Sequence, residues 1–154
     1  MLDELRELYQ EVILDHGKNP RNFRRPNKPK REAAGKNPLC GDQLVVYVDV
    51  DHNECIVDVS FLGKGCAISI ASASLMTEIV KGKSIAEAKA LFDNFIKMCT
   101  TDDFDFKGED GAEEVERLQV LSGVRQFPVR VKCATLAWHA LDAAVKGVEE
   151  ISTE

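Results

Sequence analysis

Three cysteines and one aspartate in this chain have the residue types and local settings of metal ligands. Cys40 and Asp42 stand two positions apart, with Gly41 between them, just before a predicted strand. Cys66 and Cys133 each follow a flexible or extended stretch and precede a helical pattern. Zinc accepts thiolates and carboxylates in tetrahedral sites, so these four groups can close one site if the fold brings them together.

Glycine and proline near these residues favour the turns that such a site needs. Gly41 can adopt backbone angles that other residues avoid, so its neighbours can turn toward one ion. Pro38 fixes the approach to that turn. A Gly-Lys-Gly run at residues 63–65 places Cys66 at the predicted start of a helix, where free amides and the helix dipole stabilise negative charge.

Hydrophobic periodicity predicts several helices. Apolar residues recur at helical spacing in the first and last parts of the chain. Ser84 and Glu87 have the spacing of a capping box, which marks a helix start. Helices are predicted at residues 2–15, 66–80, 84–97, 113–121 and 133–148.

Alternation with a period of two predicts two strands, at residues 43–50 and 55–62, with a hairpin loop at 51–54. Gly17 is expected to stop the first helix. Residues 19–36 contain three prolines and few apolar side chains, which predicts an extended basic connector on the surface.

Composition predicts one domain over residues 1–154 in the cytoplasm. Hydrophobic residues at 44% and charged residues at 30% are typical of soluble globular proteins. No apolar run approaches the roughly 20 residues that cross a bilayer, and the first residues lack signal-peptide features, so we expect no membrane partner. Five cysteines in a reducing compartment favour metal or sulfur chemistry over disulfides.

The net charge of the chain argues against nucleic acid as a partner. The charged residues are also unevenly distributed along the sequence. The net charge is −6, whereas binding a polyanion depends chiefly on Lys and Arg. Residues 18–36 hold eight basic side chains against the single Glu32, and residues 102–114 hold seven acidic ones against the single Lys107. Each run is either a solvated loop or a docking surface for a charged protein.

The remaining cysteines and two histidines are weaker candidates. Cys55 is expected to be a small buried or half-buried residue, and Cys99 to lie in a loop without a chemical role. His16 is expected to cap the end of a helix, and His139 to lie on a polar helix face. Spacing does not separate zinc from an iron–sulfur cluster, because both use thiolates.

Four motifs, in order, resemble the IscU/SufU (NifU N-terminal-like) proteins of iron–sulfur cluster assembly. They read ILDH with KNPRN, PLCGD, GKGCAIS and VKC, at residues 13–22, 38–42, 63–69 and 131–133. The resemblance covers nearly the whole chain. It implies an α+β fold with a small, mainly antiparallel three-stranded sheet packed against helices, as in SufE/NifU-like proteins. It also implies that Cys40, Asp42, Cys66 and Cys133 are metal ligands at one exposed edge.

Three departures from scaffold-type members indicate the SufU subtype. Lys132 stands where the scaffold type has a histidine before the third cysteine, and residues 126–130 read QFPVR where that type has LPPVK. The stretch between Lys83 and Cys133 is also longer. The resemblance therefore implies a zinc-dependent sulfurtransferase that accepts persulfide sulfur from a cysteine desulfurase of the SufS type.

Cys40 is the expected sulfur acceptor. A thiolate bound to zinc is a poorer nucleophile than a free one, so we expect docking of the desulfurase to release Cys40, while Cys66 and Cys133 remain anchors. Two alternatives use the same ligands: a scaffold on which a [2Fe-2S] cluster is assembled and transferred, and a structural zinc-binding adaptor. The side chains that can offset the site's negative charge are those of Arg125, Arg130 and Lys132.

Overall fold

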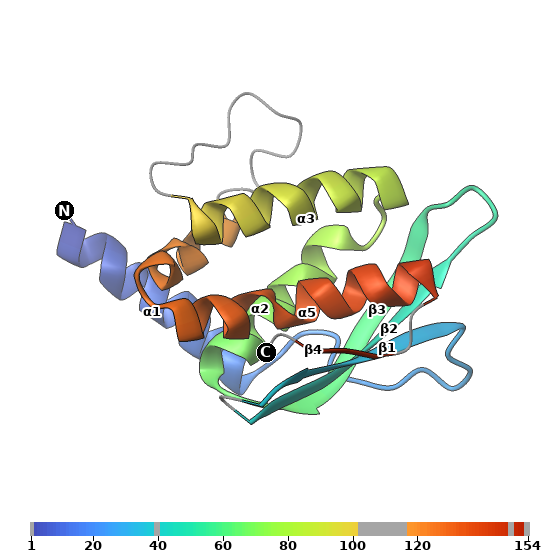
Figure 1. Ribbon diagram of the computed structural model, residues 1–154, viewed down its shortest axis with the longest axis horizontal. Helices are drawn as coiled ribbons and strands as arrows, with labels where there is room; N and C mark the ends of the chain where they lie inside the picture. Colours follow the sequence, from blue (N-terminus) through green and yellow to red (C-terminus); the bar gives the residue numbers. More distant parts are fainter. Residues whose placement is uncertain (1, 39–40, 102–116, 148–149, 153–154) are drawn as a thin grey trace.

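The computed structural model describes residues 2–38, 41–101, 117–147 and 150–152, and it has the expected α+β architecture (Figure 1). The predicted acidic run at 102–114 and most of the predicted helix at 113–121 lie outside the described residues. The elements in chain order are α1 (Leu2–Lys18), β1 (Arg31–Asn37), β2 (Asp42–Val50), β3 (Ile56–Lys64), α2 (Ala67–Val80), α3 (Ile85–Thr100), the 3₁₀ helix η1 (Gln119–Gln126), α5 (Pro128–Lys146) and β4 (Glu150–Ser152).

The strands form one sheet in the order β3-β2-β1-β4. β1, β2 and β3 pair antiparallel, which confirms the expected three-stranded antiparallel sheet. β4 adds a parallel strand beside β1, and its three residues are too few to show a periodic pattern. The register sets Asn37 opposite Asp42, and Gln43 opposite Lys64. The end of β1, the start of β2 and the end of β3 therefore lie at the same end of the sheet.

β1 occupies residues that we predicted as part of an extended connector, so that prediction is wrong at its C-terminal end. The strand contains no β-branched or aromatic residue, and pairing with β2 decides its conformation instead. Ala33, Gly35 and Asn37 are its buried positions. At Gly35 a Cβ atom would lie 3.0 Å from the Leu136 side chain, so glycine lets α5 approach the strand closely.

β3 continues through residues 63–64, where the sequence pattern indicated a break. Gly63 has a φ of +151°, and a Cβ atom there would overlap the backbone of Gln43 and Leu44 on β2. This glycine therefore permits a close strand pair and does not end the strand. Cys55 precedes β3, forms an isolated bridge with Ser84 and is half-buried, as expected.

Two helices cover one face of the sheet, and a third lies outside them. α2 and α5 pack between the strands and α3 (Figure 1). The rings of Phe95 on α3 and Trp138 on α5 stack with centroids 4.9 Å apart, and both residues are fully buried. The Ser72 hydroxyl on α2 donates a hydrogen bond to the Ala134 carbonyl on α5 at 2.5 Å. The Ser72–Ala134 bond joins α2, which Cys66 caps, to α5, which carries Cys133, and the ring stack joins α5 to α3.

α3 begins at the capping box that the sequence predicted. The Ser84 hydroxyl accepts from the Glu87 backbone N–H, and the Glu87 carboxylate accepts from the Ser84 N–H. The helix runs to Thr100, three residues beyond its predicted end. Cys99 is therefore helical and fully buried, which corrects its predicted place in a loop.

α1 also extends beyond its predicted end, because Gly17 does not stop it. The backbone N–H of Asn19 donates to the Asp15 carbonyl at 2.8 Å, so helical hydrogen bonding continues past the glycine. Gly17 has no positive φ and lies near Ala67, the first residue of α2. The end of α1 is thus positioned beside the start of α2.

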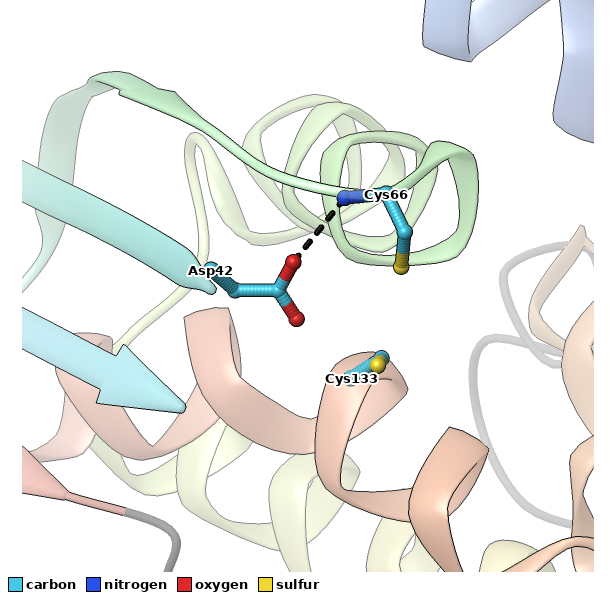
Figure 2. Close-up of side chains that lie close together, drawn as sticks. All are labelled: Asp42, Cys66 and Cys133. Atoms are coloured by element: carbon cyan, nitrogen blue, oxygen red, sulfur yellow. Dashed lines mark hydrogen bonds between the residues drawn. The ribbon is translucent and has the colours of Figure 1, made fainter. Parts of the chain in front are cut away.

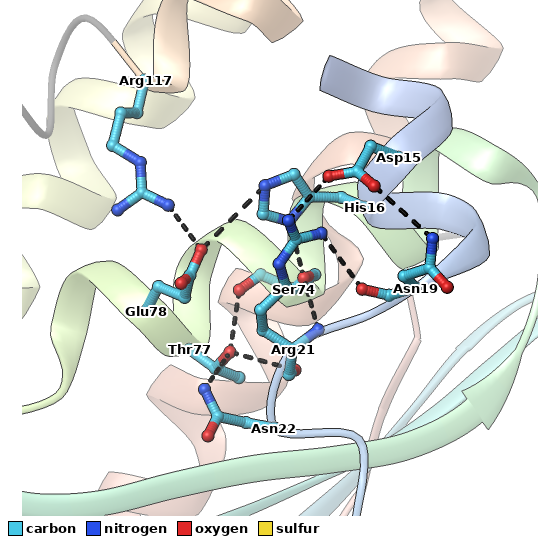
Figure 3. Close-up of polar contacts among 9 residues, drawn as sticks. All are labelled: Asp15, His16, Asn19, Arg21, Asn22, Ser74, Thr77, Glu78 and Arg117. Carbon is cyan, nitrogen blue, oxygen red and sulfur yellow. Dashed lines mark hydrogen bonds and ion pairs between the residues drawn. The ribbon is translucent and has the colours of Figure 1, made fainter. Parts of the chain in front are cut away.

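A polar network joins the end of α1 and the following connector to α2 (Figure 3). The Ser74 hydroxyl accepts a hydrogen bond from the Arg21 backbone N–H at 2.8 Å. The same hydroxyl can donate its own hydrogen bond to His16 Nδ1, which lies 2.7 Å away. His16 is buried, and burial lowers its pKa, which favours the neutral ring that accepts this proton. Further pairs at this junction are Arg21–Asp15, Asn22–Thr77 and Arg117–Glu78.

Substituting Ser84 by alanine should lower the free energy of unfolding by about 1 kcal/mol, because α3 loses its N-cap. Urea denaturation followed by circular dichroism measures this change. Ser60→Ala is the matched control, since the buried Ser60 hydroxyl has no hydrogen-bond partner among the described residues. Equal losses in both variants would show that the cap contributes nothing specific.

Candidate metal centre

Three separate elements bring Asp42, Cys66 and Cys133 together at one end of the sheet. Asp42 is the first residue of β2, Cys66 caps α2, and Cys133 lies on α5 (Figure 2). One carboxylate oxygen and the two sulfur atoms all lie within 4.8 Å of one another. Asp42 and Cys133 are almost fully buried, whereas Cys66 is half-buried. Within the described residues, the three form a cluster that one ion can join.

The Asp42 carboxylate is positioned by its place at the start of β2 and by a hydrogen bond from the backbone of another element. Its Oδ1 accepts a hydrogen bond from the Cys66 backbone N–H at 2.9 Å, which links β2 to the start of α2 (Figure 2). Gly65 leaves room for this approach, because a Cβ atom there would overlap the Asp42 carboxylate and the Ser69 hydroxyl. Burying a carboxylate without hydrogen-bond partners costs free energy, so these contacts help the fold to accommodate Asp42.

Cys66 occupies the position at the start of α2 that the sequence predicted. Its sulfur accepts a hydrogen bond from the Ser69 backbone N–H at 3.4 Å, as an N-cap side chain does. The Ser69 hydroxyl donates back to the Cys66 carbonyl at 3.0 Å. Both bonds fix the first turn of the helix, and the partial positive charge of that turn stabilises negative charge at the sulfur.

Cys133 does not mark a helix start, which corrects the sequence-based prediction. α5 begins five residues earlier, at Pro128, because the fixed φ and missing N–H of proline suit the first turn of a helix. Cys133 therefore projects from the second turn, and it is fully buried. The Asn37 side-chain amide donates toward its sulfur at 3.6 Å.

The donor set fits a single thiophilic ion. Ligand atoms of a tetrahedral zinc site are about 3.3–3.8 Å apart, given bond lengths of about 2.0–2.3 Å. The ligand atoms of the described cluster lie within 4.8 Å of one another, so binding one ion would draw them closer together. Cys40, the fourth predicted ligand and the predicted acceptor, lies outside the described residues. The adjoining Gly41 is exposed and has a φ of +70°, the left-handed conformation that makes glycine useful in this turn.

The other candidate residues lie elsewhere. His16 belongs to the junction between α1 and α2. His139 on α5 packs edge-on against the Phe92 ring with centroids 5.2 Å apart, and burial lowers its pKa. Burial raises the pKa of Cys99 to about 12, so this thiol stays protonated and inert at neutral pH. None of the three joins the described cluster.

One of the three predicted compensating cations is engaged elsewhere. The Arg125 guanidinium donates to the Met98 carbonyl at 2.7 and 2.9 Å, near the end of α3. Arg130 is exposed and Lys132 is half-buried, each within three residues of Cys133 in the sequence. Charge compensation by these two residues stays a prediction.

Asn37 is the residue beside the site that sequence reasoning missed. It is fully buried, and its amide donates toward both Asp42 and Cys133. The signal that could have found it is its pairing with Asp42 across β1 and β2, which required recognising β1 as a strand. An asparagine before a proline reads in sequence only as a turn residue.

No helix among the described residues has both the length and the hydropathy of a membrane span.

Comparisons with known proteins agree with this architecture. The model of the NifU-like N terminal domain matches residues 8–103. The iron-sulfur cluster assembly scaffold protein IscU of Streptococcus pyogenes serotype M1 is 40% identical, over 94% of this chain and 87% of its own length. The zinc-dependent sulfurtransferase SufU of Bacillus subtilis strain 168 is 41% identical, over 90% of this chain and 89% of its own.

A solved structure shares the fold at similar coverage. A putative iron-sulfur cluster assembly scaffold protein for the SUF system from Fervidobacterium islandicum AW-1 superposes with a TM-score of 0.79 at 33% identity, covering 90% of this chain and 97% of that one. The family resemblance seen in the sequence motifs is therefore confirmed. This chain belongs to the family of NifU-like N-terminal domains, with the IscU and SufU proteins of iron–sulfur cluster assembly.

Proposed function

We propose that this protein is a zinc-dependent sulfurtransferase that accepts persulfide sulfur from a SufS-type cysteine desulfurase in the cytoplasm. Zinc would be held by Cys40, Asp42, Cys66 and Cys133, with Cys40 as the acceptor. The observation that carries the proposal is the convergence of one buried carboxylate oxygen and two sulfurs within 4.8 Å. Two thiolates and a carboxylate are ligand types that zinc accepts in tetrahedral sites.

Two further observations favour this subtype. Lys132 precedes Cys133, so the histidine typical of the cluster scaffolds is missing here. One of the similar proteins, at 41% identity, carries the name zinc-dependent sulfurtransferase.

We infer that the four proposed ligands differ in how easily they can leave the metal. When bound, zinc keeps ligand thiols deprotonated near neutral pH. Cys66 is fixed by the first turn of α2, and Cys133 is buried within α5. Asp42 is fixed by the Cys66 N–H. Cys40 is the proposed movable thiol, because glycine follows it in the sequence and permits a wider range of backbone angles than other residues.

Sulfur transfer then follows thiol–persulfide exchange. The released Cys40 thiolate attacks the outer sulfur of the desulfurase persulfide, and a bond forms between these two sulfurs as the donor's S–S bond breaks. The donor cysteine leaves as a thiolate. The transferred sulfur keeps its proton, so Cys40 becomes a persulfide and neither an oxidant nor a reductant is required.

A scaffold for a [2Fe-2S] cluster is the second candidate. The Streptococcus pyogenes relative, which carries the scaffold name, is 40% identical, and thiolates also bind clusters. A cluster gives the protein a brown colour, whereas zinc is colourless because its d shell is filled. The bound metal therefore distinguishes the two candidates.

The protein purified without oxygen should be colourless and hold one zinc per chain by elemental analysis. Cys66→Ala and Cys133→Ala should weaken zinc binding by more than about 100-fold and lower the melting temperature, because ligand binding is coupled to folding. Cys55→Ala is the matched control, since Cys55 lies outside the cluster. A brown protein with substoichiometric zinc, or anchor variants that keep their zinc, would contradict the assignment.

After incubation with desulfurase and cysteine, alkylation and peptide mass spectrometry should find the extra sulfur on Cys40. Cys40→Ala should reduce the desulfurase rate to that of the desulfurase alone. Asp42→Ala should weaken zinc binding but leave the acceptor thiol in place. Persulfide recovered mainly on Cys66 or Cys133, with an active Cys40→Ala variant, would overturn the mechanism.

Activation of the desulfurase should saturate as the concentration of this protein rises, because the sulfur donor is carried on a partner protein in a specific complex. Cys40→Ala removes only the acceptor thiol, so an excess of this variant should occupy the desulfurase and inhibit activation by the wild-type chain. Steady-state assays of cysteine turnover measure both effects. A rate that rises linearly into large excess, without inhibition by the variant, would argue against a specific complex.

A further inference from the structure

Asn37 is a buried polar residue that touches two of the proposed ligands without being one. It is the last residue of β1 and pairs with Asp42, the first residue of β2. Its exposed fraction is 0%. A fully buried side-chain amide loses its hydrogen bonds to water. Its hydrogen bonds within the protein therefore determine how much its burial costs in free energy.

The Asn37 amide directs its N–H groups at the site. Nδ2 lies 3.4 Å from Asp42 Oδ2 and 3.6 Å from Cys133 Sγ, and its two hydrogens allow one bond to each. Asn37 Oδ1 has no hydrogen-bond partner among the described residues. The reversed amide would set this oxygen against a carboxylate and a sulfur that are both acceptors. The observed orientation is therefore the favourable one, at the cost of one unpartnered oxygen.

The strand that carries Asn37 is packed on several sides, which restricts the motion of its side-chain amide. β1 lies between β2 and β4, and Gly35 allows α5 to pack tightly on the strand. α5 carries Cys133, and β2 carries Asp42. One rigid side chain thus connects ligands from two elements.

We propose that Asn37 is a positioning residue of the metal centre, which holds the Asp42 carboxylate and the Cys133 sulfur close together and orients them for one ion. This inference rests on the proposed ligand set but not on the proposed sulfur transfer. Partners that orient ligands reduce the rearrangement needed on binding, and their loss typically weakens metal affinity by about 10–100-fold.

Cobalt(II) is the probe, because it occupies tetrahedral thiolate sites and its sulfur-to-metal absorption reports on the sulfur. Asn37→Leu removes the amide at similar volume, and Asn37→Ala removes it without adding bulk. Losing an N–H···S bond raises the energy of the sulfur lone pairs, so the absorption should shift to longer wavelength in both variants. Zinc affinity, from competition with a chromophoric chelator, should fall by about 10–100-fold.

Val46→Ala is the control, because Val46 is a fully buried residue of β2 with no part in the described cluster. It should lower the melting temperature without shifting the cobalt absorption. If Asn37→Leu does not fold, the Asn37→Ala measurement decides. Unchanged absorption and affinity in a folded Asn37 variant, or an equal shift in Val46→Ala, would overturn the inference. A wild-type chain that binds neither cobalt nor zinc would instead overturn the metal centre itself, and with it the proposed function.

Discussion

The burial of the Asp42 carboxylate is the constraint on which the rest of this site depends. A carboxylate with 1% of its residue exposed must find partners, because transfer of the charge out of water is costly. The Cys66 backbone N–H supplies one partner at 2.9 Å, and Asn37 approaches the other oxygen. These contacts require the start of α2 to lie against the start of β2, and Gly65 is the residue that makes this approach possible.

The same packing fixes the elements that carry three of the proposed ligands. α2 and α5 are tied by the Ser72–Ala134 hydrogen bond and by the core that they share with the sheet. Cys66 and Cys133 therefore cannot shift without disturbing the fold. The turn at Gly41 has no such packing at its Cβ position. We propose that Cys40, beside this turn, is the movable thiol, which a protein partner can reach while the other three proposed ligands keep the metal.

The features that could be predicted from sequence were those with local signals. Alternation predicted β2, and the Ser84 capping box predicted the start of α3. β1 was missed because its alanines and glycine have little strand preference, and its conformation depends on pairing with β2 and β4 and on packing against α5. Cys133 was expected at a helix start because the residues before it were interpreted as a flexible or extended stretch, whereas Pro128 opens α5. Asn37 could not be found, since its role depends on the pairing of β1 with β2.

The central claim is that one zinc ion is bound by three thiolates and one carboxylate. X-ray absorption at the zinc edge of the anaerobically purified protein tests it most directly, because the spectrum reports both the metal and its ligand atoms. The account predicts three sulfur scatterers and one oxygen scatterer around zinc, with no neighbouring metal, and the loss of one sulfur in Cys40→Ala. An iron edge with a metal–metal scattering contribution, or a zinc shell without sulfur, would contradict it.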